Sequence, residues 1–325
     1  MADRMITIVI PYYQRSPGIL RKALASIAAQ QGCPLPVHVI VVDDASPAPA
    51  GPELAAAPPM HHSVQVIAQP NAGPGAARNT GLDNAPPDTR YIAFLDSDDE
   101  WTPDHLARAV AALESGYDFY FADHYQLDQT TTAFVRAGRI QIEEHPLLPI
   151  PISGVHAYQG DMLDQIMRGN LIGTSTVVYD FTRFSAQRFK VEFANAGEDY
   201  LFWMELAHAG ANIAFSSQSE ARYGKGVNVY AGAGWGTEQH LLRIHNELKY
   251  RKTTAKLFPL TAAQHAHLNN RARDLRLAFA RDLLHRLAHR KPLPWPVLRQ
   301  HFKLDPWSFL GLPSTLLQAL LSSRK

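Results

Sequence analysis

Four acidic side chains occupy five positions directly after an apolar stretch of strand length. Residues 91–95 are apolar without alternation, and Asp96, Asp98, Asp99 and Glu100 follow at once. An uninterrupted apolar run is typical of a strand covered on both faces, as in the centre of a parallel sheet. Carboxylates this close repel each other unless a hard divalent cation binds them. The pattern fits a Mg²⁺ or Mn²⁺ site for a nucleotide-linked substrate, and an acidic turn that caps the next helix explains these residues equally well.

A second acidic pair, Asp43 and Asp44, ends the apolar residues 37–42. Open α/β sheets bind ligands outside the carboxyl ends of their strands, so this pair could accept hydrogen bonds from a base or a ribose. A turn that leads into the proline- and alanine-rich residues 47–59 is the alternative interpretation.

Residues 71–81 join two glycines and a proline to a helix of small residues, with Asn71 at the start and Arg78 inside. Backbone amides and a helix amino terminus could approach a phosphate there, with Arg78 as the counter-charge. Glycine-rich turns before helices are common, and this one is neither a Walker loop nor the dinucleotide fingerprint. The segment is therefore weak evidence by itself.

Two further acids, Glu198 and Asp199, open a predicted apolar helix at residues 198–206. They could interact with the helix dipole, or one of them could be a catalytic base that faces a cleft. From these residues alone, helix capping is the better-supported interpretation.

Five glycines between positions 224 and 236 surround Tyr230 and Trp235. This density of glycine predicts a mobile loop whose aromatic faces could pack on a sugar and close over a site.

The composition of the whole chain limits its class. It has 325 residues, 46% hydrophobic content and a formal net charge of +1, which fit a globular protein and give no global field for nucleic acid. Its single cysteine, Cys33, excludes an intrachain disulfide and fits a reducing compartment. Without a signal-peptide core or about 18 uninterrupted apolar residues, the sequence predicts a cytoplasmic protein.

The elements that must position these residues follow from periodicity. The predicted strands are residues 5–11, 37–42, 64–68, 91–95, 118–122, 176–179 and 213–215, and the predicted helices are 19–27, 104–113, 161–168 and 198–206. The opening strand, helix and strand make a parallel pair through a right-handed crossover. Residues 128–152 lack periodicity and predict an irregular excursion.

From residue 237 onward, long helical patterns alternate apolar and basic residues. The basic ones are Arg271, Arg273, Arg276, Arg281, Arg286, Arg290 and Lys291, and the tail adds Trp295, Phe302, Trp307 and Phe309. Cationic and aromatic helices of this kind could lie on an anionic membrane surface. Packing on the catalytic domain, or a homodimer seam, is equally well supported.

Taken together, five ordered stretches resemble the family 2 glycosyltransferases of the GT-A fold, and in particular the bacterial members that assemble polysaccharides. They are residues 8–13, 41–46, 71–81, 94–101 and 197–200. The resemblance implies an α/β fold with a mostly parallel central sheet flanked by helices at residues 1–222, a glycine-rich loop over the active site at 223–240, and a helical region at 241–325. Residues 223–252 also look like enzymes that build succinoglycan-type exopolysaccharides.

The resemblance implies a role for each matching position. Pro11, Tyr12, Tyr13, Asn71 and Ser97 would belong to the nucleotide-sugar pocket, Asp43 or Asp44 would accept from the uracil or ribose, and Arg78 would approach the uracil or diphosphate. Asp98 would bind the metal directly with Asp96 nearer the ribose, and Asp199 would be the catalytic base with Glu198 beside it. Many relatives carry a histidine after the last strand, where this chain has Gly224-Lys225-Gly226. Lys225, Trp235 and His240 are the candidates for the missing diphosphate or lid contact.

The implied reaction is inverting transfer of a hexose such as glucose from a UDP-sugar donor to a saccharide acceptor linked to a polyprenyl diphosphate, in exopolysaccharide or cell-surface polysaccharide biosynthesis. The implied location is the cytoplasm, at the inner face of the plasma membrane. One alternative is a sugar-nucleotide nucleotidyltransferase, which should carry a lysine-bearing glycine-rich signature near its amino terminus. The other is a non-catalytic scaffold that binds sugar nucleotides, which should lack Asp199.

Overall fold

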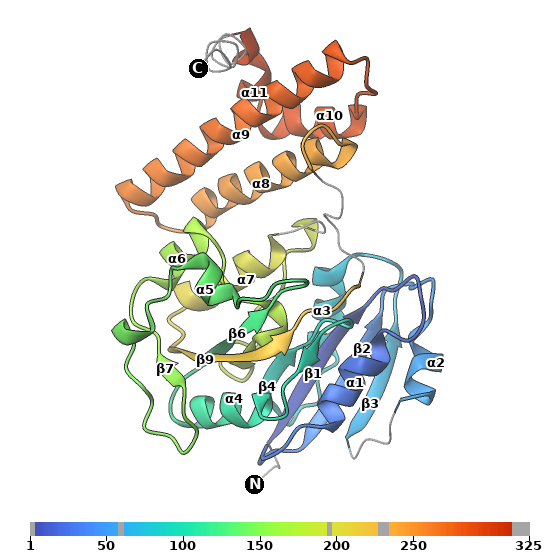
Figure 1. The fold of residues 1–325 in the computed structure, drawn as a ribbon, viewed down its shortest axis with the longest axis vertical. Helices are drawn as coiled ribbons and strands as arrows, with labels where there is room; N and C mark the ends of the chain where they lie inside the picture. The colour runs from blue at the N-terminus through green and yellow to red at the C-terminus, as the bar shows by residue number, and fades with distance from the viewer. Residues whose placement is uncertain (1–3, 58–61, 194–196, 227–233, 314–325) are drawn as a thin grey trace. The chain divides into compact units, whose positions relative to one another are not determined.

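The computed structural model describes residues 4–57, 62–193, 197–226 and 234–313. The chain divides into two units, Met1–Ala194 with Glu198–Val227 and Asn228–Lys325 with Asn195–Gly197. The first unit contains the central sheet, and the second contains the carboxyl-terminal helices (Figure 1).

The first unit is an α/β domain built on a nine-stranded mixed sheet. Its strands are β1 Met5–Tyr12, β2 Val37–Asp43, β3 Ser63–Ala68, β4 Thr89–Phe94, β5 Glu100–Trp101, β6 Phe119–Tyr125, β7 Val155–Ala157, β8 Val178–Asp180 and β9 Ile213–Arg222. The order is β3-β2-β1-β4-β8-β6-β9-β5, with β7 paired to β9. All seven predicted strands are present, which confirms the predicted fold class.

Strand direction divides this sheet into two parts. The strands β3, β2, β1 and β4 are mutually parallel, as the uninterrupted apolar runs predict. The short strand β8 lies antiparallel to both β4 and β6, whereas β6 and β9 are parallel to each other. The parallel part brings the ends of β1, β2 and β4 to one edge, where the predicted acidic residues follow.

Helices cover both faces of the sheet (Figure 1). On one face, α1 (Leu20–Ala28) and α4 (His105–Glu114) share a core cluster with alternate strand residues such as Ile8. On the other face, α3 (Pro74–Asp83) lies so close to β1 that a Cβ on Gly81 would be 2.3 Å from Val9 Cγ1. The neighbouring residues Ile8 and Val9 of β1 therefore face opposite layers of helices. Only glycine at position 81 permits this close approach of α3 to β1.

The remaining elements of the first unit connect these layers. They are α2 Ala50–Ala55, α5 Ala133–Ala137, α6 Met162–Arg168, α7 Glu198–His208, and the 3-10 turns η1 Ile142–Glu144, η2 Thr174–Thr176 and η3 Val191–Phe193. The predicted irregular excursion at 128–152 contains only the short α5 and η1. The aromatic rings of Phe202 and Trp203 in α7 pack against Phe94 in β4, whose strand neighbour Val9 lies under Gly81 of α3 on the same face.

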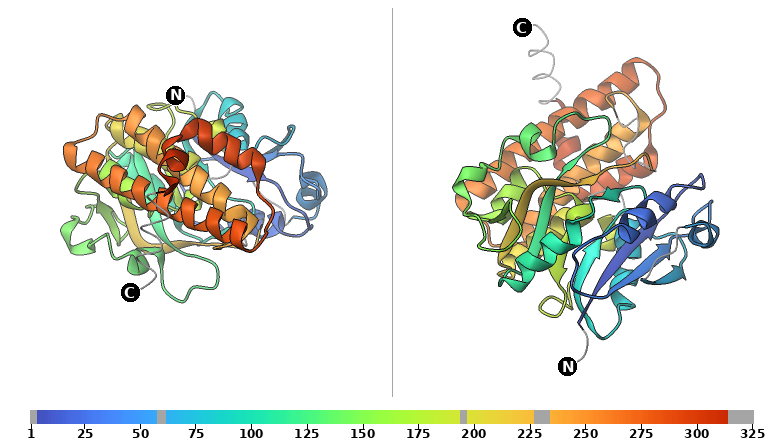
Figure 2. Two further views of the ribbon diagram at one scale, coloured as in Figure 1. Left: turned by 90° about the horizontal axis from the view of Figure 1, so that it is seen from above. Right: turned by 60° about the horizontal axis from the view of Figure 1, so that its bottom comes forward.

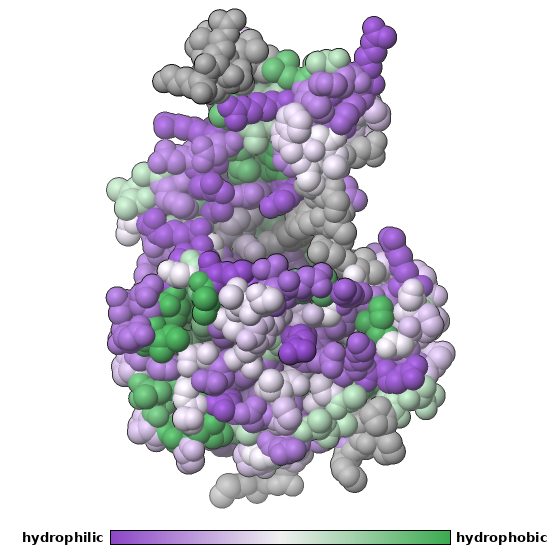
Figure 3. All heavy atoms as spheres, in the orientation of Figure 1, coloured by the Kyte–Doolittle hydropathy of each residue, from purple (hydrophilic) through white to green (hydrophobic). Residues whose placement is uncertain are grey.

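The second unit is helical, as the sequence predicts. It contains α8 Glu238–Leu257, α9 Ala262–Ala288, α10 Trp295–Leu304 and α11 Trp307–Leu310, with α8 and α9 side by side (Figure 2). Leu241, Leu248, Leu275, Phe279 and Leu298 form its own hydrophobic core. Among the described residues, none of the helices combines the length and hydrophobicity needed to cross a membrane. The face of the molecule in Figure 3 is mostly hydrophilic, with small hydrophobic patches.

Candidate functional site

The acidic motif after β4, the glycine-rich helix α3 and the acidic start of α7 meet through one arginine. Arg78 Nη2 lies 2.6 Å from Asp96 Oδ1, and Arg78 Nη1 lies 3.4 Å from Glu198 Oε1. Its guanidinium also lies over the ring of Phe189, 5.3 Å from the centroid. Three of the stretches that the sequence singled out therefore form one buried cluster.

In the structure, Arg78 pairs with acidic side chains of the protein itself. The resemblance implied that it approaches the uracil or diphosphate of a ligand. Burial alone would lower its pKa, but the carboxylates of Asp96 and Glu198 raise it, so the guanidinium stays charged. Gly75 allows the close packing of α3 on this cluster, because a Cβ there would be 3.2 Å from Glu198 Cγ. The geometry assigns Arg78 the role of joining the acidic motif to α7.

Backbone amides and hydroxyls hold the acidic motif from two sides. Asp98 Oδ2 accepts from the Gly226 amide at 2.7 Å, and Asp99 Oδ1 accepts from the Gly224 amide at 2.9 Å. Asp99 Oδ2 accepts from the hydroxyl of Ser175. Asp96 is the more open member, with about a third of its side chain exposed.

Charge within this motif is only partly neutralised. Burial raises the pKa of Asp98, and the neighbouring Asp96 raises it further. Burial likewise raises the pKa of Asp99 well above its ordinary value, with Asp96 and Asp98 adding to the effect. A divalent cation at this position would favour the ionised carboxylates and reverse these shifts.

The donor set fits a cation that is shared with a phosphate. Among the described residues, no cluster of three or more His, Cys, Asp or Glu side chains is arranged to hold a metal by itself. Arg78 and Gly226 each engage one oxygen, of Asp96 and Asp98 respectively, which leaves the second oxygen of each carboxylate without a hydrogen bond to another described residue. Mg²⁺ is usually held by one or two carboxylates together with substrate phosphates, so these two oxygens suffice.

The segment Gly224-Lys225-Gly226 lies directly on Asp98. A Cβ on Gly224 would be 1.6 Å from the Asp98 carbonyl oxygen, and one on Gly226 would be 2.5 Å from its carboxylate. Neither position can carry a side chain without displacing the motif. This chain thus presents two backbone amides to the acidic motif.

The two candidate base residues lie at the start of α7, where Glu198 is buried and Asp199 is half-buried. Burial raises the pKa of Glu198 to about 8, with Asp199 adding to the rise and Arg78 opposing it. Burial also raises the pKa of Asp199, again against the effect of Arg78. Glu198 Oε2 is buried and has no hydrogen-bond partner among the described residues. Raised carboxylate pKa values in a buried cluster are characteristic of acid–base sites.

The turn η2, for which the sequence predicted no role, contacts both acidic groups. The Ser175 hydroxyl accepts from the Asp96 amide at 3.0 Å and donates to Asp99, while the Ser175 carbonyl accepts from the Trp101 indole. The adjacent Thr174 hydroxyl lies 3.4 Å from Asp199 Oδ2. The only sequence signal was three consecutive hydroxyl residues before β8, and it carries no periodicity.

The other predicted nucleotide-pocket residues mainly shape the surrounding loops. Asp43 accepts from the amides of Ser46 and Ala50 at 2.8 and 2.9 Å. Asp44 accepts from the amides of Ala72 and Gly73, both at 2.8 Å, and its carbonyl accepts from Asn71 Nδ2 at 2.9 Å. Asp43 therefore makes the turn into the following segment, and Asp44 fixes the glycine-rich segment to the end of β2, whereas a contact of either residue with a base or ribose stays a prediction.

Residues 11–13 differ in how they could reach a ligand. Pro11 and Tyr12 are buried, and the Tyr12 hydroxyl donates to the Ala48 carbonyl at 2.7 Å, whereas Tyr13 is half-buried. Ser97 is also buried and accepts from Gln14 Nε2 at 3.1 Å. Tyr13 is thus the more accessible of the three predicted pocket residues.

The predicted lid and diphosphate residues belong to different units of the chain. Lys225 is exposed and lies 3.6 Å from Asp128 Oδ1 in the first unit. Trp235 and His240 belong to the second unit, where Trp235 packs on His285 and His240 pairs with Asp282. Tyr230 lies outside the described residues.

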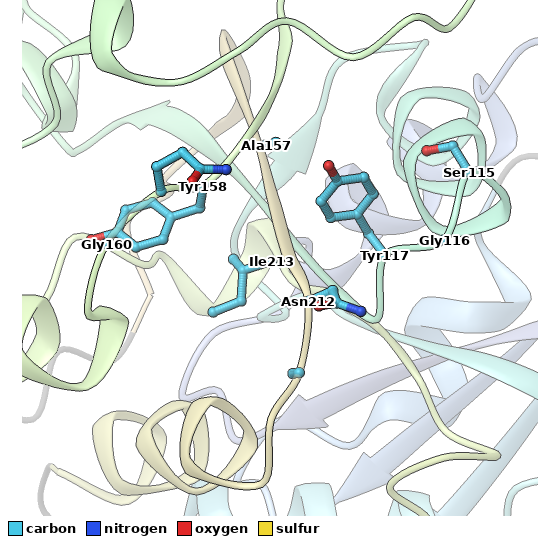
Figure 4. Close-up of a pocket in the computed structure, with 10 residues that line it drawn as sticks. Ser115, Gly116, Tyr117, Ala157, Tyr158, Gly160, Asn212 and Ile213 are labelled. Carbon is cyan, nitrogen blue, oxygen red and sulfur yellow. The ribbon is translucent and has the colours of Figure 1, made fainter.

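A cavity of about 370 Å³ lies away from the acidic motif. Its lining includes Tyr117, Tyr158, Asn212 and Ile213, and Figure 4 shows the two tyrosines on either side of Ile213. Ile213 begins β9, whereas Ala221 and Arg222 at the far end of β9 pair with β5 beside the acidic motif. Nearly the full length of a ten-residue strand separates this cavity from the candidate site.

Comparisons with known proteins agree with these motifs. Residues 7–183 match the profile described as "Glycosyl transferase family 2". The chain is 37% identical over 259 residues to the succinoglycan biosynthesis protein ExoW of Rhizobium meliloti (strain 1021), which covers 74% of this chain and 75% of ExoW.

Solved structures share the fold at low sequence identity. TarS 1-349 of S. aureus in complex with UDP-GlcNAc has a TM-score of 0.55 and 18% identity, and covers 87% of this chain and 73% of that one. The mannosyltransferase PcManGT of Pyrobaculum calidifontis in complex with GDP-Man and Mn²⁺ has a TM-score of 0.54 and 16% identity, and covers 97% of this chain and 86% of that one.

Proposed function

The chain belongs to glycosyl transferase family 2, and from that premise we propose that it transfers a hexose from a UDP-sugar to a hydroxyl of a saccharide acceptor with inversion at the anomeric carbon. The observation that supports this most strongly is the Arg78 bridge, which keeps the acidic motif and the acids of α7 at one site. Donor-side and acceptor-side chemistry both need acidic groups at such a site. Membership of this family also argues against the nucleotidyltransferase alternative.

In the proposed reaction, Asp199 takes the proton of the acceptor hydroxyl while the acceptor oxygen bonds to the anomeric carbon. The bond from that carbon to the diphosphate breaks, and UDP leaves with the electron pair. The raised pKa of Asp199 brings this base closer to neutral pH, where a general base works best. Glu198 supports it by binding Arg78, which ties α7 to the acidic motif.

Asp98 and Asp96 are the residues that would hold Mg²⁺ or Mn²⁺, because each keeps an oxygen free of other described residues. A bound cation would neutralise the charge that builds on the leaving diphosphate. The amides of Gly224 and Gly226 hold Asp99 and Asp98 in place beside it.

We further propose that the acceptor is a saccharide carried on a polyprenyl diphosphate, in the assembly of an exopolysaccharide or another cell-surface polysaccharide. ExoW, by its name, takes part in succinoglycan biosynthesis, which supports this product class. A lipid-carried acceptor would bring the enzyme to the inner face of the membrane. Whether the protein acts as a homodimer stays a prediction.

The test is mass-spectrometric detection of transfer from a panel of UDP-sugars, with GDP-mannose included because PcManGT was solved with GDP-Man. We expect transfer from a UDP-hexose, and Asp199→Asn should lower turnover by about a hundredfold or more. Asp83→Asn is the matched control, because Asp83 is exposed and pairs only with Arg188 among the described residues. Transfer from GDP-mannose alone would contradict the proposed donor, and full activity in Asp199→Asn would contradict the proposed base.

A further inference from the structure

Large apolar side chains project from the carboxyl-terminal end of the second unit. Trp295, Phe302, Trp307 and Leu310 are 61%, 51%, 67% and 67% exposed. The exposed cations Arg299 and Lys303 lie between them in the chain. These six residues make up what we call the α10–α11 face.

The face is held rigidly by the other side of the same helices. In α10, Trp295, Arg299 and Phe302 follow each other at spacings of four and three, which places them on one side. Leu298 is buried in the core of the unit, and the His301 ring stacks on Phe279 at 4.2 Å between centroids. The exposed aromatic residues are therefore presented by an anchored amphipathic helix.

The face carries no exposed negative charge among the described residues. From position 283 to the end of the chain, Asp305 is the only acid in the sequence. Asp305 is fully buried and is bound by Arg276 at 2.7 Å and Lys252 at 2.8 Å. In contrast, neither Arg299 nor Lys303 has an ion-pair partner among the described residues, so both charges face solvent.

Several of the basic residues between Arg271 and Lys291, which the sequence suggested as a membrane-facing surface, form ion pairs in the structure. Within the basic run of α9, Arg271 lies 3.4 Å from Glu247, Arg276 binds Asp305, and the buried Arg286 binds Asp282 at 3.0 Å. Much of that run is neutralised within the unit. On α10, by contrast, two cations without a described ion-pair partner occur in the same stretch of chain as exposed aromatic rings.

We propose that the α10–α11 face docks on an anionic lipid bilayer. Tryptophan and phenylalanine side chains favour the interface between head groups and acyl chains, and the two cations would be attracted to anionic head groups. A second copy of this chain is the less suitable occupant. An isologous interface would repeat Arg299 and Lys303 on both sides, and Asp305, the only acid in the sequence from position 283 onward, is buried.

The experiment is flotation of the full-length protein with vesicles of phosphatidylcholine alone or with added phosphatidylglycerol. We expect binding to the anionic vesicles only, weakened by 0.5 M salt through screening. Each Lys or Arg near an anionic surface is worth about fivefold in affinity, so Arg299→Gln with Lys303→Gln should weaken binding roughly 25-fold. Trp295→Ser with Trp307→Ser should also weaken it.

The matched control is Lys256→Gln with Arg273→Gln, which removes two exposed charges elsewhere in the same unit. It should retain at least half of the wild-type affinity. Equal binding to neutral vesicles, no binding at all, or an equal loss in the control would overturn the proposal. So would a dimer in light scattering that the Trp295→Ser and Trp307→Ser variant converts to a monomer. Flotation uses no sugar nucleotide, so these outcomes are independent of the proposed transfer reaction.

Discussion

At the scale of single residues, the acidic motif contains side chains with different tasks. Asp99 is buried, and both of its oxygens accept hydrogen bonds, one from the Ser175 hydroxyl and one from the Gly224 amide. It therefore joins the acidic motif to η2 and to the segment that follows β9. Asp96 and Asp98 each retain an oxygen for a ligand. The three neighbouring carboxylates are therefore not interchangeable.

Replacing Asp98 by Asn should remove metal-dependent donor binding without unfolding the chain. The amide oxygen can still accept from Gly226, but the charge that binds a divalent cation is lost. We expect the affinity for the donor in the presence of Mn²⁺ to fall at least about tenfold. Calorimetric titration of the sugar nucleotide with and without Mn²⁺ measures this.

Asp104→Asn is the control for that titration, because Asp104 pairs with Arg108 outside the acidic motif. Donor affinity that responds to Mn²⁺ equally in the wild type and in Asp98→Asn would show that the metal assignment is wrong.

The adjacent hydroxyls of η2 should have separable effects on catalysis. Ser175→Ala leaves Asp99 Oδ2 without a donor while Oδ1 keeps the Gly224 amide, and we expect the Mn²⁺ concentration for half-maximal activity to rise about tenfold or more. Thr174→Val removes the contact with Asp199 and should lower kcat with little change in the metal requirement. Ser175→Thr keeps the hydroxyl and should restore the metal response.

If Ser175→Ala and Thr174→Val changed kcat and the metal requirement in parallel, η2 would stabilise the fold without a separate role for each hydroxyl. Measuring the thermal midpoint of each variant separates that case, because a positioning role changes the kinetic constants at unchanged stability.

At the scale of elements, most of the first unit could be predicted because its longer strands, such as β1, β2 and β4, are apolar runs, whereas β5 and β7 have only two and three residues and were not predicted. The strand β9 is the informative exception, since it continues to Arg222 where the sequence predicts an end near Phe215. Its second half reads as polar, but Glu220 is buried and binds Tyr120 and His105, each at 2.8 Å. Burial of a paired charge leaves no signal in hydrophobic periodicity.

The same limit applies to the site itself. The acidic residues were visible in the sequence because they end strands or begin a helix. The contacts of Ser175 and of the Gly226 amide were not visible, since both reach the motif from segments about 80 and 130 positions away. Pairings over such distances depend on the completed fold.

In the segment that follows β9, Gly226→Ala should abolish metal-dependent donor binding. Its Cβ would be 2.5 Å from the carboxylate of Asp98, so either the segment or the carboxylate must move. Gly51→Ala is the matched control, because a Cβ there meets nothing within 4 Å. Calorimetry of donor binding with Mn²⁺ gives the comparison, and equal affinities in the two variants would mean that the segment can shift without consequence.

At the scale of the whole molecule, two units with separate cores are joined in one chain, and the second has a polar interior of its own. His301 is fully buried and contacts His245 Nδ1 at 3.3 Å and Ser308 Oγ at 3.0 Å. Asp305, with Lys252 and Arg276 bound to it, completes the charged surroundings of this ring. Burial lowers the pKa of His301 to about 4, and His245 adds to the effect.

Acid should therefore weaken the second unit at mild pH. Between pH 6.5 and about 4, unfolded His301 binds a proton that folded His301 does not, so the free energy of unfolding falls as the pH falls. From pH 7 to pH 5 we expect a loss of about 2 kcal/mol from this group. The lowered pKa of Asp305 adds a further loss only in stronger acid, since its favourable ion pairs persist until that carboxylate is protonated.

Urea titrations at pH 7 and pH 5, read by pulse proteolysis with fragments assigned by mass spectrometry, follow the second unit within the full chain. His301→Gln should lower stability at pH 7, because the stacked ring is lost, yet it should flatten the pH dependence. His265→Gln, on the exposed side of α9, should keep the wild-type slope. A slope that is the same in His301→Gln and the wild type would mean that another group, with His245 the first candidate, carries the acid sensitivity of this unit.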